Sequence, residues 1–468
     1  MIAYIPRLIG RLSVGCRTRH AARHHLIAKA LMPLGLIVAS SVSLTTPVSA
    51  VTLSGDLYRA LYLDPQISQS AARSCQAVYD LGIERAEKRV QLSGRLTGER
   101  DLAHNFNNNS DRGETPARLR GFNEGENDLF DAEIEGRYRL YDWGVSDNRI
   151  SAERTRLAAS RLSIEIELAE RARELLEVLI AYEHTQTEIS LLGQALDELV
   201  PHLEAMEAQS TAGSLSVSDY RSAKLAELDL DIRYQRAERQ LIQIEREIEE
   251  QFGIAVDVAK PLLTLFLDNR PAEAASITAE EWSAVRLQDL SVQATRHDLH
   301  AIENELFPTI DGVVTSTVFD LTDFESEYQV SGRIEFRLPL YDGGANKAQR
   351  ARTDWRIREL QATRDERLRE FETQASRIAV DISRRAEEQA NVQARLNDIE
   401  TRFNSLMALL GNSLVSRLDI TQLITHRATT KIEMSQTIWQ QESAFLQAQW
   451  LSDRLLQILT IQIGENAC

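Results

Sequence analysis

The sequence Glu335-Phe336-Arg337-Leu338-Pro339-Leu340-Tyr341-Asp342-Gly343-Gly344 alternates between apolar and charged residues, stops at a glycine pair and continues into a long helical sequence. An earlier copy, Glu135-Gly136-Arg137-Tyr138-Arg139-Leu140-Tyr141-Asp142-Trp143-Gly144, lies 200 residues before it. The same offset aligns Gly213 with Ser413 and Asp219 with Asp419. A similarity kept in register over this length predicts a duplicated structural unit.

The first 50 residues have the composition of a secretory signal peptide. Their basic residues come without any acidic one, an apolar run extends from about residue 30 to residue 44, and Val48-Ser49-Ala50 supplies a small-x-small cleavage site. The apolar run is shorter than the roughly 20 residues that a membrane-spanning helix needs. We therefore expect cleavage after residue 50 rather than an N-terminal membrane anchor.

Charge and motif content argue against several functions. The net charge is −17, and so acidic a chain repels nucleic acid. The sequence contains no phosphate-binding glycine loop, nucleophile elbow or Cys-x-x-Cys motif, so neither an enzyme nor a cofactor is expected. His297, His300 and Glu303 have helical spacing, but such trios are common on charged helix faces and predict no metal site. Whether Cys75 and Cys468 form a disulfide is left open.

The predicted strands have one apolar and one polar face. Around residues 130–140 the apolar face carries Phe130, Ala132, Ile134, Tyr138 and Leu140, and around residues 328–338 it carries Tyr328, Val330, Ile334, Phe336 and Leu338. The opposite faces carry Glu133, Glu135, Arg137, Arg139, Arg333, Glu335 and Arg337. In a secreted protein, this alternation favours a transmembrane barrel wall over a soluble sheet, with the charged residues lining a water-filled lumen.

Long helices are predicted after Gly144 and Gly344. Apolar residues at heptad spacing extend each helix to some 65 residues, or about 100 Å at ~1.5 Å per residue. The expected organisation is a first repeat over 51–254, an irregular connector over 255–277 and a second repeat over 278–468. Each repeat would contain a helix, two strands, a long helix and a returning helix. Four strands cannot close a barrel, so several chains would have to share one.

These features together resemble the TolC-like outer-membrane efflux proteins. The resemblance rests on the signal peptide, the two ordered halves, Tyr-Asp-x-Gly at each strand-to-helix junction and the Gly-(x)5-Asp helical tip. It implies a mixed α and β fold, in which a homotrimer builds one β-barrel in outer-membrane lipid and one helical barrel through the periplasm. It also implies a periplasmic adaptor and an inner-membrane transporter as partners.

The helical tips are the expected docking and gating sites. The docking residues would be Gly213, Ser214, Leu215, Ser216, Ser413, Leu414, Val415 and Ser416. Asp219 and Asp419 would crowd the periplasmic end of the pore, and we expect Arg417 to pair with Asp219 of the same or a neighbouring chain. The chain departs from the family at Ser413, where the family has glycine. It also lacks most residues that close the pore of the best-known member, so that gate cannot be transferred.

The sequence therefore predicts the outer-membrane channel of a tripartite efflux or type I secretion system, located in the outer membrane and extending into the periplasm. The alternative is a periplasmic coiled-coil scaffold without a pore. The alternating strands favour the channel. A wide aqueous passage needs no dedicated pocket, so the exported substrate cannot be read from the sequence.

Overall fold

The computed structural model describes residues 61, 64–100, 128–269, 278–319, 328–410, 416–459 and 461. The chain divides into two units, 1–50 and 51–468, and every described residue belongs to the second unit. The predicted signal peptide and residues 411–415 of the second tip lie outside the described residues.

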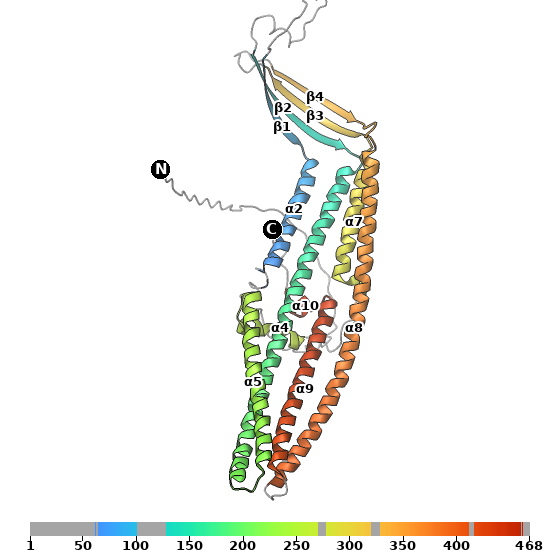
Figure 1. Cartoon of the computed structure of the whole chain (residues 1–468). Coiled ribbons are helices and arrows are strands. Elements are labelled where there is room, and N and C mark those ends of the chain that lie inside the picture. Colours follow the sequence, from blue (N-terminus) through green and yellow to red (C-terminus); the bar gives the residue numbers. More distant parts are fainter. Residues whose placement is uncertain are drawn as a thin grey trace, which may run out of the picture. The chain divides into compact units, whose positions relative to one another are not determined.

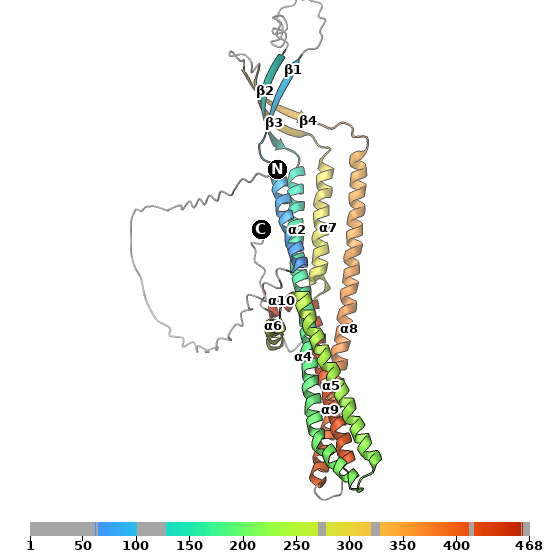
Figure 2. The ribbon, with the colours of Figure 1, turned by 60° about the vertical axis from the view of Figure 1, so that its left-hand side comes forward.

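The fold is mostly helical with one four-stranded sheet. The elements in chain order are α2 (Pro65–Glu87), β1 (Gln91–Arg100), β2 (Asp128–Tyr141), α4 (Val145–Thr211), α5 (Val217–Phe252), α6 (Val256–Asn269), η2 (Ala279–Glu281), α7 (Ser283–Asn304), β3 (Thr309–Val318), β4 (Tyr328–Arg337), α8 (Ala345–Leu410), α9 (Arg417–Leu451) and α10 (Leu455–Ile458). Helices α2, α4, α7 and α8 lie side by side below the sheet (Figures 1 and 2). Helix α5 packs on α4, and α9 packs between α4 and α8.

The two long helices have the predicted length. Helix α4 has 67 residues and α8 has 66. The heptad residues of α4 form its buried seam, with Leu168, Leu175, Leu192, Leu199 and Met206 all inaccessible to solvent. Near the tips, this seam packs against the apolar faces of α5, α8 and α9 in one core cluster. Burial along a continuous stripe stabilises helices of this length far more than intrinsic propensity does.

The connector is more ordered than predicted. Residues 255–277 are expected to be irregular because of Pro261 and Pro271, but α6 occupies Val256–Asn269. Its residues Ala259, Leu262, Leu263 and Phe266 have helical spacing and are buried in a core cluster that also includes α4 residues. Burial of this stripe offsets the backbone hydrogen bond that Pro261 removes.

The last long helix is shorter than predicted. The apolar pattern of the sequence predicts that the returning helix of the second repeat extends from about Leu418 to Ile463, whereas α9 ends at Leu451. Asp453 has a φ of 53°, in the left-handed region, and the Arg454 amide donates to the carbonyl of Gln449 at 3.1 Å. The Asp453 carboxylate also accepts a hydrogen bond from the Ser283 amide, at 2.6 Å, where α7 begins. Helix α9 therefore ends where the chain turns to cap another helix.

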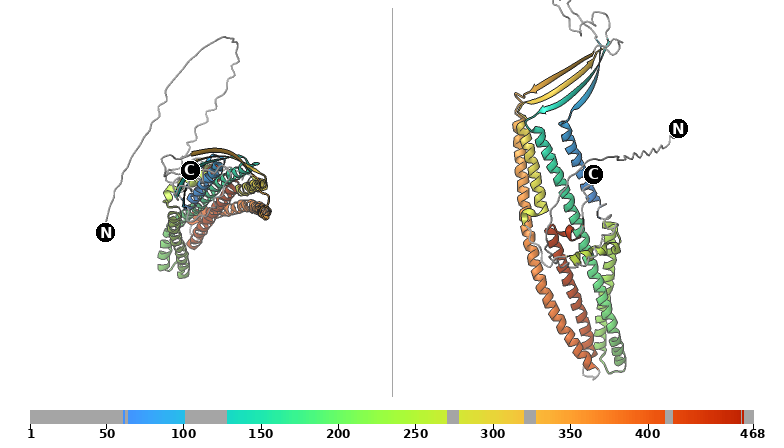
Figure 3. Two further views of the ribbon diagram at one scale, coloured as in Figure 1. Left: turned by 90° about the horizontal axis from the view of Figure 1, so that it is seen from above. Right: turned by 180° about the vertical axis from the view of Figure 1, so that it is seen from behind.

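The sheet is antiparallel, with the order β1-β2-β3-β4 (Figure 3). The central pairing of β2 with β3 joins strands from the two halves of the chain, and it places Arg139 opposite Asp311. The register shifts between Arg139 and Tyr141, just before the chain leaves the sheet. Among the described residues, β1 and β4 each pair with a single strand, so the sheet has two open edges.

The Tyr-Asp-x-Gly sequence is a helix-capping device at both strand-to-helix junctions. The Asp142 carboxylate accepts hydrogen bonds from the amides of Gly144 at 3.1 Å and Ser146 at 2.9 Å. The Asp342 carboxylate accepts the equivalent bonds from Gly344 at 2.9 Å and Asn346 at 2.7 Å. The two glycines have φ values of 82° and 88°, which non-glycine residues rarely adopt.

These caps predict a pH-dependent contribution to stability. Burial raises the pKa of Asp142, but hydrogen bonds from Ser146 and Gly144 outweigh burial and hold this pKa below its usual value. Hydrogen bonds from the Asn346 and Gly344 amides lower the pKa of Asp342. A carboxylate with a lowered folded-state pKa stabilises the fold above its unfolded pKa of about 3.9, and this stabilisation disappears as pH falls through the folded value.

We expect Asp142→Ala to destabilise the protein by about 1–2 kcal/mol at neutral pH, because the amides at the start of α4 lose their acceptor. Thermal unfolding of the purified protein measures this change. Asp354→Ala is the matched control, since Asp354 lies exposed on α8. The difference between the two variants should shrink as the pH approaches 3. Equal melting temperatures at neutral pH would contradict the capping role.

Candidate channel-lining site

One face of the sheet is apolar and exposed. Phe130, Ile134 and Tyr138 of β2 project from it, together with Val330, Ile334 and Phe336 of β4, and all six side chains are exposed. Ile334 is 77% accessible to solvent. A contiguous apolar face of this kind requires a partner or a lipid environment. The alternation predicted from the sequence is therefore confirmed in the residues of both strands.

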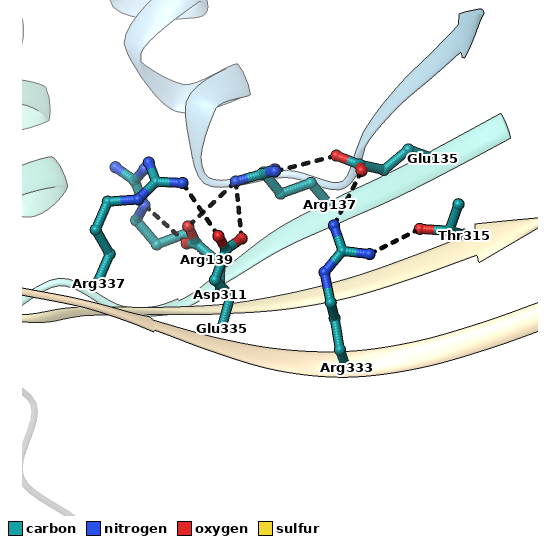
Figure 4. A network of polar contacts seen from close by, with 8 residues as sticks. All are labelled: Glu135, Arg137, Arg139, Asp311, Thr315, Arg333, Glu335 and Arg337. Carbon is teal, nitrogen blue, oxygen red and sulfur yellow. Dashed lines mark hydrogen bonds and ion pairs between the residues drawn. The ribbon is translucent and has the colours of Figure 1, made fainter. Parts of the chain in front are cut away.

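The opposite face carries an ion-pair network across β2, β3 and β4 (Figure 4). Arg137 lies at its centre, with guanidinium nitrogens 3.1 Å from Glu135, 3.4 Å from Glu335 and 3.7 Å from Asp311. Arg139 pairs with the other oxygen of Asp311 at 3.3 Å. The charges thus pair across β2, β3 and β4 on one face of the sheet, and such cross-strand pairs favour the observed register.

The fourth strand supplies the remaining members of the network. Arg333 reaches Glu135 at 3.2 Å and donates to the Thr315 hydroxyl at 3.1 Å, while Arg337 pairs with Glu335 at 3.3 Å. The structure therefore brings together six of the seven predicted lumen residues. The seventh, Glu133, lies further along β2, opposite Arg95 of β1.

Asp311 is the member that the sequence prediction omits. Its side chain is only 2% exposed and lies between Arg137 and Arg139. The alternation of Ile310, Gly312 and Val314 could have placed Asp311 on the polar face. Its pairing with two arginines, however, depends on the register between β2 and β3, which strand alternation alone does not reveal.

The first helical tip is a compact turn. Gly213 has a φ of 73°, and the Ser214 amide donates to the carbonyl of Gln209 at 2.9 Å, which closes the end of α4. The Ser216 hydroxyl accepts from the Ser218 amide at 3.1 Å and caps α5. Asp219 lies in the first turn of α5, where the helix dipole favours an acid.

The second tip is described only from Ser416 onward. Its residues Ser413, Leu414 and Val415 lie outside the described residues. Ser416 caps α9 by accepting from the Leu418 amide at 3.2 Å, and Asp419 lies in the first turn of that helix. The two described helix starts therefore match, with serine as the cap and aspartate three residues later.

The predicted gate pair does not form within the described part of one chain. None of the ion pairs there joins Arg417 to Asp219. Arg417 lies close enough to His202 of α4 to affect its ionisation. Burial lowers the pKa of His202, and the positive charge of Arg417 lowers it further. A pairing of Arg417 with Asp219 of a neighbouring chain stays a prediction.

Three further observations concern membrane-spanning helices, metal sites and cysteines. Within the described ranges, no helix combines the length and the apolar character needed to cross a membrane. The same ranges contain no group of three His, Cys, Asp or Glu residues that could hold a metal ion. Cys75 is disulfide-bonded, and the possible partner considered in the sequence, Cys468, lies outside the described residues.

Comparison with known proteins identifies the fold. No family model and no curated protein sequence matches the chain. Among solved structures, a membrane protein from Pseudomonas aeruginosa is 16% identical, with 85% of this chain and 90% of that chain covered and a TM-score of 0.66. The outer membrane protein VceC from Vibrio cholerae is 13% identical, with 87% and 95% covered and a TM-score of 0.66.

A third similar structure is the MtrE outer membrane channel of Neisseria gonorrhoeae in its open state. It is 12% identical, with 85% of this chain and 88% of that chain covered and a TM-score of 0.62. The similarity thus spans most of each chain at low sequence identity. The fold is that of the TolC-like outer-membrane channels, and the resemblance noted in the sequence is confirmed at this level.

Placing the same lysine substitution at two adjacent positions of β2 tests which face is apolar and which is polar. We expect Ile134→Lys to cost about 2–4 kcal/mol near the bilayer midplane, because the ammonium group would face lipid. Glu133→Lys places the same group on the polar face and should cost far less. Urea unfolding of the protein refolded into lipid vesicles compares the two variants. Similar losses of stability would contradict the assignment of the faces.

Proposed function

We propose that the protein is the outer-membrane channel of a tripartite efflux or type I secretion system, a passive duct across the outer membrane and the periplasm. The observation that carries this proposal is the open sheet with one exposed apolar face and one charged face, next to helices of about 100 Å. The apolar face suits lipid and the charged face suits water. The likeness to outer-membrane channels supports the same function.

We propose further that three identical chains share the barrel. Open strand edges are not tolerated in lipid, and a single-chain barrel needs about eight strands or more. Strands β1 and β4 would therefore pair with strands of neighbouring copies. The internal duplication also belongs to this proposal. It is supported by the equal element order in the two halves and by the equivalent caps at Asp142 and Asp342.

The tips are the proposed contact with an adaptor and an inner-membrane transporter. The compact turn at Gly213 leaves short polar side chains at the end of α4, where a partner can approach the backbone. Asp219 and Asp419, at matching helix starts, are the proposed gate carboxylates, and Arg417 is the proposed partner of Asp219 from a neighbouring chain. Like charges that crowd one narrow opening favour cations or a basic neighbour.

The channel and the scaffold alternative differ in two measurable ways. We expect the mature protein to require detergent for extraction and to produce stepwise conductance in planar lipid bilayers. A periplasmic scaffold would remain in the soluble fraction and leave the bilayer sealed. The scaffold result in both assays would overturn the proposed function.

Docking at the tip predicts a phenotype that depends on position. Gly213 and Gly253 have φ values of 73° and 67°, and an added Cβ at either position meets no atom within 4 Å. Gly213→Phe and Gly253→Phe therefore impose the same backbone strain, about 1–2 kcal/mol each. Only Gly213 lies at the tip. We expect Gly213→Phe to abolish export while the protein still reaches the outer membrane, and Gly253→Phe to retain export. Normal export by both variants would show that the tip is a simple turn without a docking role.

A further inference from the structure

A buried histidine lies near the helical tips without a hydrogen-bond partner for one of its ring nitrogens. His202 of α4 is 7% exposed, and its Nδ1 atom has no hydrogen-bond partner among the described residues. Its neighbours along α4, Leu199, Leu203 and Met206, belong to the core cluster that joins α4 to α5, α8 and α9. A buried polar atom without a partner costs free energy, so His202 makes this end of the core weaker than an apolar residue would.

The charged groups that act on His202 come from the two helices that meet there. Burial lowers the pKa of His202 most, Arg417 at the start of α9 lowers it further, and Glu198 of α4 raises it. Within the described residues, no charged group of α5 or α8 contributes to this shift. Residues 411–415, between α8 and α9, contain no titratable side chain. The neutral imidazole is therefore the form that suits this site at neutral pH.

The acid that acts on His202 is already engaged. Glu198 forms an ion pair with Arg427 of α9, and the Arg427 guanidinium lies 3.9 Å from the ring centroid of Phe403 of α8. These contacts connect α4, α9 and α8. A protonated His202 would either remain without a counterion near Arg417 or draw Glu198 away from Arg427. Both results weaken the packing of α9 on α4.

The second histidine of α4 that faces α9 has different surroundings. The His184 Nδ1 atom lies 3.4 Å from the Ser435 hydroxyl of α9, and the charge of Glu188 opposes the lowering of the His184 pKa by burial. A protonated His184 therefore has a hydroxyl that can accept its hydrogen bond and a carboxylate nearby. A protonated His202 has Arg417 nearby instead, so His202 is the more acid-sensitive of the two.

The backbone on both sides of the contact is weak at this point. Pro201, inside α4, removes one backbone hydrogen bond directly before His202. Helix α9 begins at Arg417, after the Ser416 cap, so the charge that acts on His202 belongs to a helix end. Helix ends open locally at a lower free energy than helix centres. A change of charge at His202 can therefore move the start of α9 without unfolding the rest.

We propose that His202 is an acid-sensitive switch that releases the start of α9 from α4. The neutral imidazole packs against α9, whereas the imidazolium repels Arg417 and gains a second N–H donor. In the released state His202 would bind a proton more readily than in the packed state, so packing weakens as pH falls below about 6.5. In the proposed channel this release would widen the periplasmic end, and only that consequence rests on the proposed function.

Hydrogen–deuterium exchange of the purified protein measures the release. Peptides covering residues 418–430 are compared at pH 7.5 and 5.5, after correction for the intrinsic pH dependence of amide exchange. A histidine with an ordinary pKa of about 6.5 in the released state favours release by up to about tenfold at pH 5.5. We expect a severalfold rise in exchange at pH 5.5. The caps at Asp142 and Asp342 remain ionised at both pH values and do not contribute.

The same substitution at two histidines separates His202 from general effects of acid. His202→Leu removes the titratable group and should abolish the acid response, whereas His426→Leu removes an exposed histidine of α9 and should retain it. Arg417→Gln keeps His202 but removes the opposing charge, so its acid response should be smaller than that of the wild type. No acid response in the wild type, or an undiminished response in His202→Leu or Arg417→Gln, would overturn the proposal.

Bilayer conductance of the same samples separates this proposal from the proposed function. We expect the wild-type channel to conduct more at pH 5.5 than at pH 7.5, and His202→Leu to show no such increase. An acid response in exchange that His202→Leu abolishes, from a wild-type protein that never conducts, would support the switch and contradict only the channel.

Discussion

Backbone groups of a strand within a bilayer must find hydrogen-bond partners, because lipid offers none. In the proposed channel this constraint falls on β1 and β4, which each pair with one strand among the described residues. The side chains impose a second demand, since one face of the sheet exposes apolar residues while the other carries paired charges. A barrel shared between copies satisfies both demands, and the rest of the architecture is compatible with it.

The junctions between strands and helices connect this sheet to the helical part of the molecule. At each junction a glycine with positive φ redirects the chain, and Asp142 or Asp342 accepts the first helical amides. The helices then continue by burial of a heptad seam, with α5 and α9 packed near the tips. The same few residues thus end a strand, begin a helix and fix the direction in which about 100 Å of helix extends.

Much of this fold could be predicted because its patterns repeat over long stretches. Strand faces follow from period two, and the long helices follow from heptad spacing. The helix α6 is harder to predict, since the signal from Pro261 opposes the apolar spacing around it. The sequence does not mark Asp311 as a member of the ion-pair network, because its arginine partners depend on the register between β2 and β3. Arg156 of α4 and Asp298 of α7 are distant in sequence, and only the packing of these two helices brings them together.

In the proposed channel a single chain contributes an incomplete barrel wall. This can be tested by mass measurement of the detergent-solubilised protein, with bound detergent subtracted. We expect a particle that contains three chains and resists dissociation as long as the sheet remains folded. A stable monomer in lipid, with the strand signal of the folded protein intact, would contradict it.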